Sequence, residues 1–341
     1  MSGGNGIDHR LASETRRATV ALLLATVLWG CGFTWAKAAG DAVHRTLGLP
    51  TGSAFGPVFV LGWRFSVAAV ILFMLMRRAR VGWTTSSLLR VVGVGLLLYL
   101  GLVLQHLGLD LTPEAVSAFL TSLTILFVPM ILTVALRKPP PAVMWAGVVL
   151  ATAGVWLLVT GGERAGFTLG WGEALGLACA VAFSLYILAV NAAARSVDAW
   201  QLTAGQFVVV GLACFVTCAL VKGHEAMRPA RALELVSSGR DIWLNIFLLM
   251  LFPTVGAFTL LNLYQPKLDP TRAALIYLVE PVIAAAYAWL TVGRKLPPEK
   301  LLGATLILVA NGVVELLAAR GKAAQPPPSR AGEPQAPMVE G

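Results

Sequence analysis

Charged residues are scarce in this sequence. Asp, Glu, Lys and Arg make up 13% of its 341 residues, and hydrophobic residues make up 57%. A soluble domain carries about 25% charged residues, so the composition excludes an ordinary soluble protein and predicts a membrane protein that crosses the bilayer many times. The net charge is +9, and nearly all the basic residues that produce it lie between the apolar runs. Basic residues in such loops set the orientation of a membrane protein in the bilayer. We therefore expect no nucleic-acid partner.

Cysteine and the common catalytic motifs are also scarce or missing. The four cysteines all lie inside apolar runs, which predicts buried free thiols and no disulfide framework. Cys214 and Cys218 are one helical turn apart, but no His or carboxylate stands near them to complete a metal site. The chain has no phosphate-binding loop, no H-E-x-x-H and no G-x-S-x-G. We expect no bound cofactor, no metal, no ATP hydrolysis and no enzymatic activity.

Ten apolar runs follow one another along the chain, each near the ~20 residues that a helix needs to cross ~30 Å of hydrocarbon. Their apolarity on all sides predicts helices, because the strands of a membrane barrel alternate polar and apolar residues. The class expected is therefore an all-α integral membrane protein. The ten runs are residues 19–36, 58–76, 91–109, 115–136, 143–159, 175–193, 202–221, 242–263, 273–292 and 301–318.

Lys and Arg are divided unevenly between the two sides of the predicted membrane domain. The side that holds both termini carries more of them, and the group at 77–90 is the densest. Because basic loops stay in the cytoplasm, we expect both termini to be cytoplasmic. The expected location is the inner (cytoplasmic) membrane of the cell.

The second half of the chain repeats the first. Residues 115–159 align without a gap on residues 271–315, at an offset of 156. In this alignment Glu280 is matched by Thr124. Each half holds five spans, an odd number, so the second half enters the membrane in the opposite direction. Inverted repeats with a site near the midplane are a recurring plan of secondary transporters. Other matched pairs are Ala118 with Ala274, Pro141 with Pro297, Gly147 with Gly303, Trp29 with Phe183 and Arg64 with Gln206.

An ordered set of motifs accompanies this repeat. It comprises Trp29-Gly30 in the first span with Lys37 at its end, Arg64-Phe65 in the second span, and Glu280-Pro281 followed by the turn at 293–298. Over about residues 19–319 the set resembles the EamA-type branch of the drug/metabolite transporter superfamily. The resemblance implies two five-helix repeats around a central cavity, and export or exchange of small metabolites.

The repeat and the resemblance together predict the domain limits. We expect the first EamA-type repeat at residues 19–160 and the second at 169–319. Residues 1–18 are predicted to be disordered, and residues 320–341 to form a disordered, proline-rich cytoplasmic tail.

Glu280 is the strongest candidate for function. A charge at the centre of a spanning helix costs ~2.5–3.5 kcal/mol or more, so an acid there is by default a functional-site hypothesis. One alternative is structural: a protonated Glu280 could bond a carbonyl freed by Pro281. The other is that Glu280 carries protons, provided that no cation such as Arg64 or Lys37 holds it in the charged form.

Two basic residues and several polar residues could belong to the same pathway. Arg64 could bind an anionic group or could extend its side chain to the interface, and for Lys37 we favour the interface. Gln105, His106 and Asn262 could line the pathway, and the alternative for them is hydrogen bonding between helices. His106 is also a secondary candidate for proton relay. The remaining candidate cavity residues, for which ordinary packing is the alternative, are Tyr277, Trp29, Thr121, Thr124 and Ser184.

The function expected is secondary active transport, as an exporter or exchanger of small organic metabolites such as amino acids or drug-like compounds, with protons as a candidate coupling ion. The alternative is a membrane protein that does not transport, either an enzyme or an assembly subunit. An enzyme should bring acid–base or metal-binding groups together, whereas the titratable groups here are scattered singly along the spans. The expected partners are a small-molecule substrate and the lipid bilayer. Oligomeric state cannot be read from the sequence.

Overall fold

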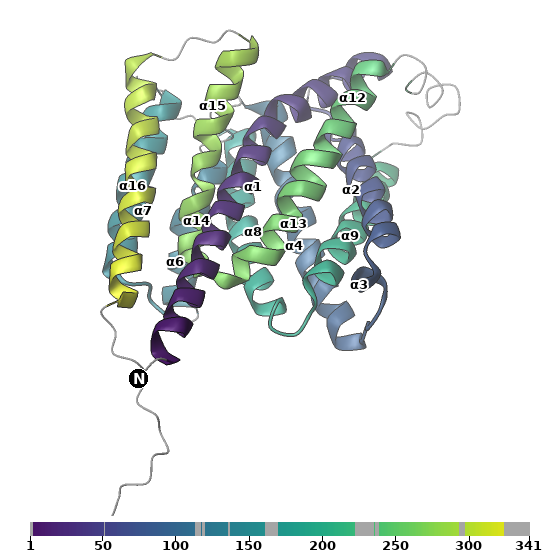
Figure 1. Cartoon of the computed structure of the whole chain (residues 1–341). Coiled ribbons are helices and arrows are strands. Elements are labelled where there is room, and N and C mark those ends of the chain that lie inside the picture. The colour runs from purple at the N-terminus through teal and green to yellow at the C-terminus, as the bar shows by residue number, and fades with distance from the viewer. Residues whose placement is uncertain are drawn as a thin grey trace, which may run out of the picture.

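The structure is a computed structural model that describes residues 3–50, 52–112, 117, 120–135, 137–160, 170–221, 235, 239–292 and 297–323. Every element with printed bounds in these residues is helical, and the long helices run side by side (Figure 1). The first half holds α1 (Gly3–Leu47), α2 (Phe55–Leu75), α3 (Arg77–Arg80), α4 (Thr85–Leu111), α6 (Thr124–Val134) and α7 (Ala142–Thr160). The second half holds α8 (Trp171–Ala193), α9 (Ala199–Leu220), α12 (Arg240–Leu249), η1 (Met250–Ala257), α13 (Phe258–Tyr264), η2 (Gln265–Lys267), α14 (Pro270–Tyr277), α15 (Val279–Val292) and α16 (Pro298–Ala323).

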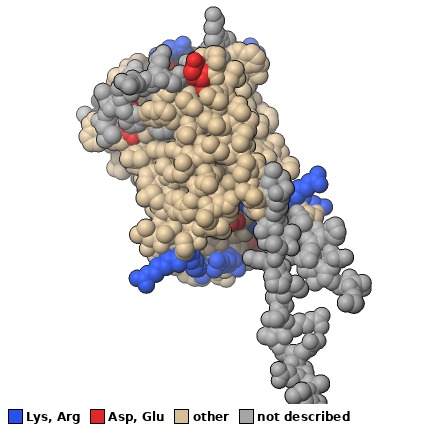
Figure 2. Space-filling view, turned by 90° about the vertical axis from the view of Figure 1, so that its left-hand side faces the viewer, with Lys and Arg blue, Asp and Glu red and all other residues tan. Residues whose placement is uncertain are grey.

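Seven helices in the described part of the chain are long and apolar enough to cross a membrane. Two shorter apolar helices, Leu120–Val134 and Ala142–Leu157, accompany them. Lys and Arg gather toward the ends of the molecule and leave the face between them without charge over most of its area (Figure 2). The all-helical, multi-pass class is confirmed, and the count of ten spans stays a prediction. The seven candidate spans are Ser13–Leu47, Phe55–Leu75, Thr85–Leu111, Trp171–Ala193, Ala199–Leu220, Arg240–Lys267 and Pro270–Thr291.

The N-terminal segment differs from the expectation. We predicted disorder for residues 1–18, but α1 begins at Gly3 and runs without a break to Leu47. The segment 3–18 has no proline and holds several good helix formers, so it can continue the helix of the first span outward. At the other end of the chain α16 continues to Ala323, and the rest of the predicted tail lies outside the described residues.

The helices pack in pairs that join the two halves. Helix α4 of the first half packs against α8 and α9 of the second half. In the opposite sense, α12 packs against α1, and η1 packs against both α1 and α2. The helix pairs α2 with α9, and α7 with α16, each join one helix from each half. Three phenylalanines lie at the centre of the largest apolar cluster, where the ring centroid of Phe65 is 5.2 Å from that of Phe207 and 5.8 Å from that of Phe258. The core is therefore built between the halves as much as within them.

The eighth predicted span is interrupted by proline. Pro253 has no N–H, so the carbonyl of Leu249 loses its helical donor. The backbone widens into the π-helix η1, and the hydroxyl of Thr254 donates to that carbonyl at 2.9 Å. The freed backbone group is thus satisfied inside the protein, as the bilayer requires.

The ninth predicted span is also interrupted, at the residue before Val279 and Glu280. Helix α14 ends at Tyr277 and α15 begins at Val279, with Leu278 between them at φ −64° and ψ −11°. The N–H of Leu278 donates to the carbonyl of Leu275 at 3.1 Å, the spacing of a 3₁₀ turn. The first half has a similar turn before Thr124, where the N–H of Leu123 donates to the carbonyl of Leu120 at 3.1 Å. Both halves therefore carry a break in the corresponding span.

Small residues let α7 approach α16 closely. Gly147, Ala151 and Gly154 lie on one face of α7, and the two glycines meet Val314 and Gly303 of α16. Ala151 is fully buried, and a Cβ placed at Gly154 would lie 2.8 Å from the carbonyl oxygen of Gly303 on α16. This contact involves backbone, which cannot give way as a flexible side chain can.

Gly154→Ala should therefore weaken the α7–α16 contact. Inserting a methyl group into a packed interface costs about 1–3 kcal/mol, so we expect a lower melting temperature of the purified protein in detergent. Gly93→Ala is the matched control, because nothing lies within 4 Å of a Cβ placed at Gly93 in α4. Equal melting temperatures for the two variants would show that the close approach at Gly154 is not a feature of the folded protein.

Candidate substrate cavity

A cavity of about 120 Å³ lies between the two halves of the chain. Residues of α1, α2, α4, α8, η1, α13 and α14 line it, together with Leu278 and the start of α15. The segment around the break in the first half contributes Thr121, Ser122 and Thr124. Its wall is mostly aromatic and aliphatic, which is typical of small-molecule sites. Of the residues predicted from sequence, the cavity brings together Trp29, Arg64, Gln105, His106, Thr121, Thr124, Tyr277 and Glu280.

Glu280 lies at the start of α15, directly after the break in the span. Its side chain is half-buried and forms no hydrogen bond or ion pair with another described residue. The structural alternative required Glu280 to bond a carbonyl freed by Pro281, and the described residues contain no such bond. Glu280 therefore faces the cavity without a partner among the residues that the structure describes.

Arg64 is the cationic counterpart in the cavity wall. It is 4% exposed, so it lies inside the bundle and does not extend to the interface. Its Nε atom is buried without a hydrogen-bond acceptor, and its Cζ lies 5.0 Å from the centroid of the Phe65 ring. Within the described residues Arg64 forms no salt bridge with a carboxylate. The cavity thus contains one acid and one base that do not neutralise each other.

Polar residues of α4 and of the segment before α6 form a second side of the cavity. His106 Nδ1 bonds the carbonyl of Leu102 at 2.8 Å, and its Nε2 is buried without a partner. The amide of Gln105 donates to the hydroxyl of Thr121 at 3.5 Å. The hydroxyl of Thr124 donates to the carbonyl of Thr121 at 2.7 Å. The threonine hydroxyls are therefore engaged locally, whereas His106 keeps an unused nitrogen.

Two predicted residues do not line the cavity. Ser184 is fully buried, and its hydroxyl donates to the carbonyl of Ala180 at 2.7 Å and to that of Thr124 at 3.4 Å. The amide of Asn262 donates to the carbonyl of Phe258 at 2.8 Å. Asn262 thus bonds its own helix and not a neighbouring one, whereas Ser184 bonds both its own helix and the start of α6.

Trp29 and Tyr277 are fixed by the irregular backbone and by a buried amide. The indole N–H of Trp29 donates to the carbonyl of Pro253 at 3.0 Å, and its ring meets that of Tyr277 edge-on at 5.4 Å. The hydroxyl of Tyr277 donates to Gln265 Oε1 at 2.8 Å. Gln265 in turn donates to Asn191 Oδ1 at 2.8 Å, which ties α14 to α8. Both rings are therefore held in place as a wall of the cavity.

Some lining residues were missed by the sequence analysis. Phe183 and Tyr186 on α8 line the cavity, and the hydroxyl of Tyr186 donates to Gln206 Oε1 at 3.2 Å. The repeat contained a signal for Phe183, because this residue matches Trp29. Tyr186 lies three residues later on the same helix face. Phe33 lines the cavity as well, but nothing in the sequence distinguishes it from other apolar residues of α1.

Comparison with known proteins identifies the family. Two segments of the chain, residues 16–160 and 170–314, each match the EamA-like transporter family, and together they cover most of the chain. This chain belongs to the EamA-like transporter family. The family and the apolar helices make it a multi-pass membrane transporter, which confirms the resemblance noted from the sequence.

One relative and one solved structure are similar to this EamA protein over most of its length. An uncharacterized transporter of Archaeoglobus fulgidus is 25% identical over 299 residues, which cover 88% of this chain and 86% of the relative. A protein of known crystal structure has a similar fold, with a TM-score of 0.65 and 22% identity, over 90% of this chain and 99% of the other. The second likeness concerns the fold alone.

The buried network behind Tyr277 generates a prediction for this EamA transporter. Tyr277→Phe removes the donor to Gln265, a residue that is fully buried. A buried acceptor left without a donor costs about 1–3 kcal/mol, so the melting temperature in detergent should fall. Tyr264→Phe is the control, since the Tyr264 hydroxyl has no hydrogen bond to another described residue. If both variants have the melting temperature of the wild type, the Tyr277–Gln265 hydrogen bond does not stabilise the cavity wall.

Proposed function

We propose that this transporter is a secondary active exporter or exchanger of small organic metabolites. The observation that carries the proposal is the cavity between the halves, in which Glu280 and Arg64 face the same space without neutralising each other. An intramembrane acid and base without protein partners mark a substrate or ion pathway. The membership of a transporter family supports transport over the alternative of a membrane enzyme or assembly subunit.

The two halves act, in this proposal, as inverted five-helix repeats with ten spans in all. The helix contacts support this arrangement, because the main contacts between the halves recur when the halves are exchanged. The pair α4 with α8 corresponds to α12 with α1, and α6 with α8 corresponds to α15 with α1. The pairs α2 with α9 and α7 with α16 correspond to themselves. Alternating access then arises when one half rocks against the other around the central cavity.

The cavity lining favours substrates that combine an apolar body with polar or charged groups. Aromatic side chains such as Trp29, Phe183 and Tyr186 offer ring surfaces, while Arg64 and Glu280 offer one charge of each sign. Amino acids and amphipathic drug-like compounds have this combination. Binding of a carboxylate by Arg64 would give its buried guanidinium the acceptor that it lacks among the described residues.

Glu280 is the proposed site of proton coupling. The ionised carboxylate costs ~2.5–3.5 kcal/mol or more at the membrane centre. Without a cation bound to it, Glu280 can take up a proton when its environment closes and release it when the cavity opens to water. A carboxylate in a salt bridge would resist this exchange, and none of the described residues forms one with Glu280.

Glu280→Gln tests this proposal because glutamine has the shape of the protonated acid. In proteoliposomes with an imposed pH gradient, we expect the variant to lose accumulation of labelled amino acids, while exchange without a gradient continues. Glu299→Gln is the matched control, since Glu299 is an exposed acid in the first turn of α16. If Glu280→Gln still concentrates substrate with unchanged pH dependence, Glu280 is not the coupling residue.

The proposed orientation places both termini in the cytoplasm of a cell with this protein in its inner membrane. In a background without the four native cysteines, a single cysteine at Gly162 should react with an impermeant thiol reagent in intact cells. A cysteine at Gly321 should react only after lysis. Gly162 lies outside the described residues, so the experiment depends on the span count alone. Reaction at Gly321 in intact cells would reverse the orientation.

A further inference from the structure

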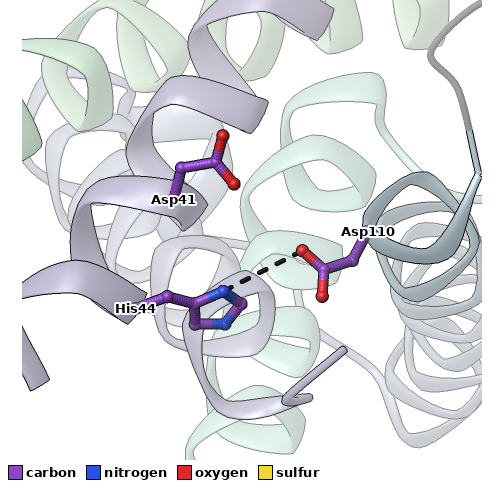
Figure 3. A group of neighbouring side chains, drawn as sticks. All are labelled: Asp41, His44 and Asp110. Carbon is purple, nitrogen blue, oxygen red and sulfur yellow. Dashed lines mark ion pairs between the residues drawn. The ribbon is translucent and has the colours of Figure 1, made fainter. Parts of the chain in front are cut away.

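Three potential metal ligands meet at one end of the molecule, outside the central cavity. Asp41 and His44 lie near the end of α1, and Asp110 lies near the end of α4 (Figure 3). One ligand atom from each residue lies within 4.8 Å of the others, and His44 Nδ1 is 3.9 Å from Asp110 Oδ1. The imidazole ring faces Asp110, and Asp41 stands one helical turn before His44 on the same helix.

The hydrogen bonds around this cluster orient its members for a cation. His44 Nε2 lies 3.0 Å from the carbonyl of Ser53 and donates to it, because a carbonyl can only accept. In neutral His44 this leaves the lone pair of Nδ1 directed at the carboxylate of Asp110. A carbonyl that fixes the tautomer of a ligating histidine is a common second partner at metal sites. Asp110 Oδ2 accepts from the backbone N–H of Gly52, so Oδ1 stays available.

The electrostatics of the cluster also favour a cation. Two carboxylates and a nitrogen lone pair face one another, and each repels its neighbours unless a positive charge lies between them. Both α1 and α4 end here, and the C-terminal end of a helix carries partial negative charge. Lys37 lines the small cavity that contains Asp41 and Asp110, so its charge competes with a bound ion and lowers the ion's affinity.

We propose that Asp41, His44 and Asp110 form a binding site for a divalent transition-metal ion such as Zn²⁺. Zinc accepts imidazole nitrogens and carboxylate oxygens as ligands, and sites with three protein ligands commonly hold water in the fourth position. A bound ion ties the end of α1 to the end of α4. The small cavity beside it shares Ala36, His106 and Leu109 with the central cavity, so the ion stands beside an approach to that cavity.

Titration calorimetry of Zn²⁺ into the purified full chain, free of any histidine tag, tests the site. We expect the wild type to bind one more ion than Asp41→Asn does, or the variant's affinity to fall at least about tenfold. Asp41 is exposed and its carboxylate makes no hydrogen bond to a described residue, so this variant should fold normally. Asp241→Asn is the matched control: Asp241 is another exposed acid, in the first turn of α12, and lies outside the cluster.

Two further variants separate the site from adventitious binding. His44→Gln should lower the affinity for Zn²⁺ as Asp41→Asn does, whereas Lys37→Gln should raise it. The other histidines and all four cysteines stay in every variant, so they cannot produce a difference. Amide hydrogen exchange of the segments around Leu47 and Leu111 should slow on addition of Zn²⁺ in the wild type and not in Asp41→Asn. Equal Zn²⁺ affinity in wild type, Asp41→Asn and His44→Gln would overturn the proposal, whatever the transport activity.

Discussion

A proline inside a membrane-spanning helix removes one backbone donor, and hydrocarbon offers no water to replace it. This constraint determines the centre of the protein. At Pro253 the helix widens, Thr254 satisfies the freed carbonyl of Leu249, and the carbonyl of Pro253 itself accepts the indole N–H of Trp29. The irregular backbone must therefore face protein, and it lies at the cavity wall. Trp29 gains its fixed position from the same proline that interrupts the helix.

The two EamA repeats preserve local bonds as well as helix order. His106 and Asn262 are matched across the repeat, and each bonds the carbonyl four residues earlier, Leu102 and Phe258, at 2.8 Å. Those two carbonyls are themselves matched at the same offset. Each side chain also keeps a buried polar atom without a partner, Nε2 in His106 and Oδ1 in Asn262. The repeated feature is thus a polar group anchored to its own helix, and only the copy on α4 reaches the cavity.

Much of this architecture was readable from the sequence because the bilayer imposes simple rules. Apolar runs of sufficient length predicted helices, and costly residues such as Glu280 and Arg64 marked the interior. All the predicted site residues except Ser184 and Asn262 line the cavity. Those two failed because a hydroxyl or amide can bond its own helix, and sequence spacing does not determine how far a helix is rotated about its axis.

The cluster at Asp41, His44 and Asp110 was missed for a different reason. Asp110 is far from Asp41 and His44 in the chain, and the predicted spans 19–36 and 58–76 leave Asp41 and His44 between them, in a connecting segment. The structure instead continues α1 to Leu47, which places both residues on one helix face. The position of a helix end determines which side chains can meet. Helix boundaries are also the least certain part of a prediction from sequence.

Arg64 and Glu280 show why such a protein must change its shape to function. Each charge is costly in the membrane interior, and a direct salt bridge between them would reduce that cost. The fold keeps them apart, each in contact with the cavity and neither paired within the described residues. Burial without a partner is tolerable only if something other than the protein supplies the partner, whether substrate, water or a proton. Each of these must enter through an opening and leave again, so charges that are costly in a closed cavity favour conformations that open it.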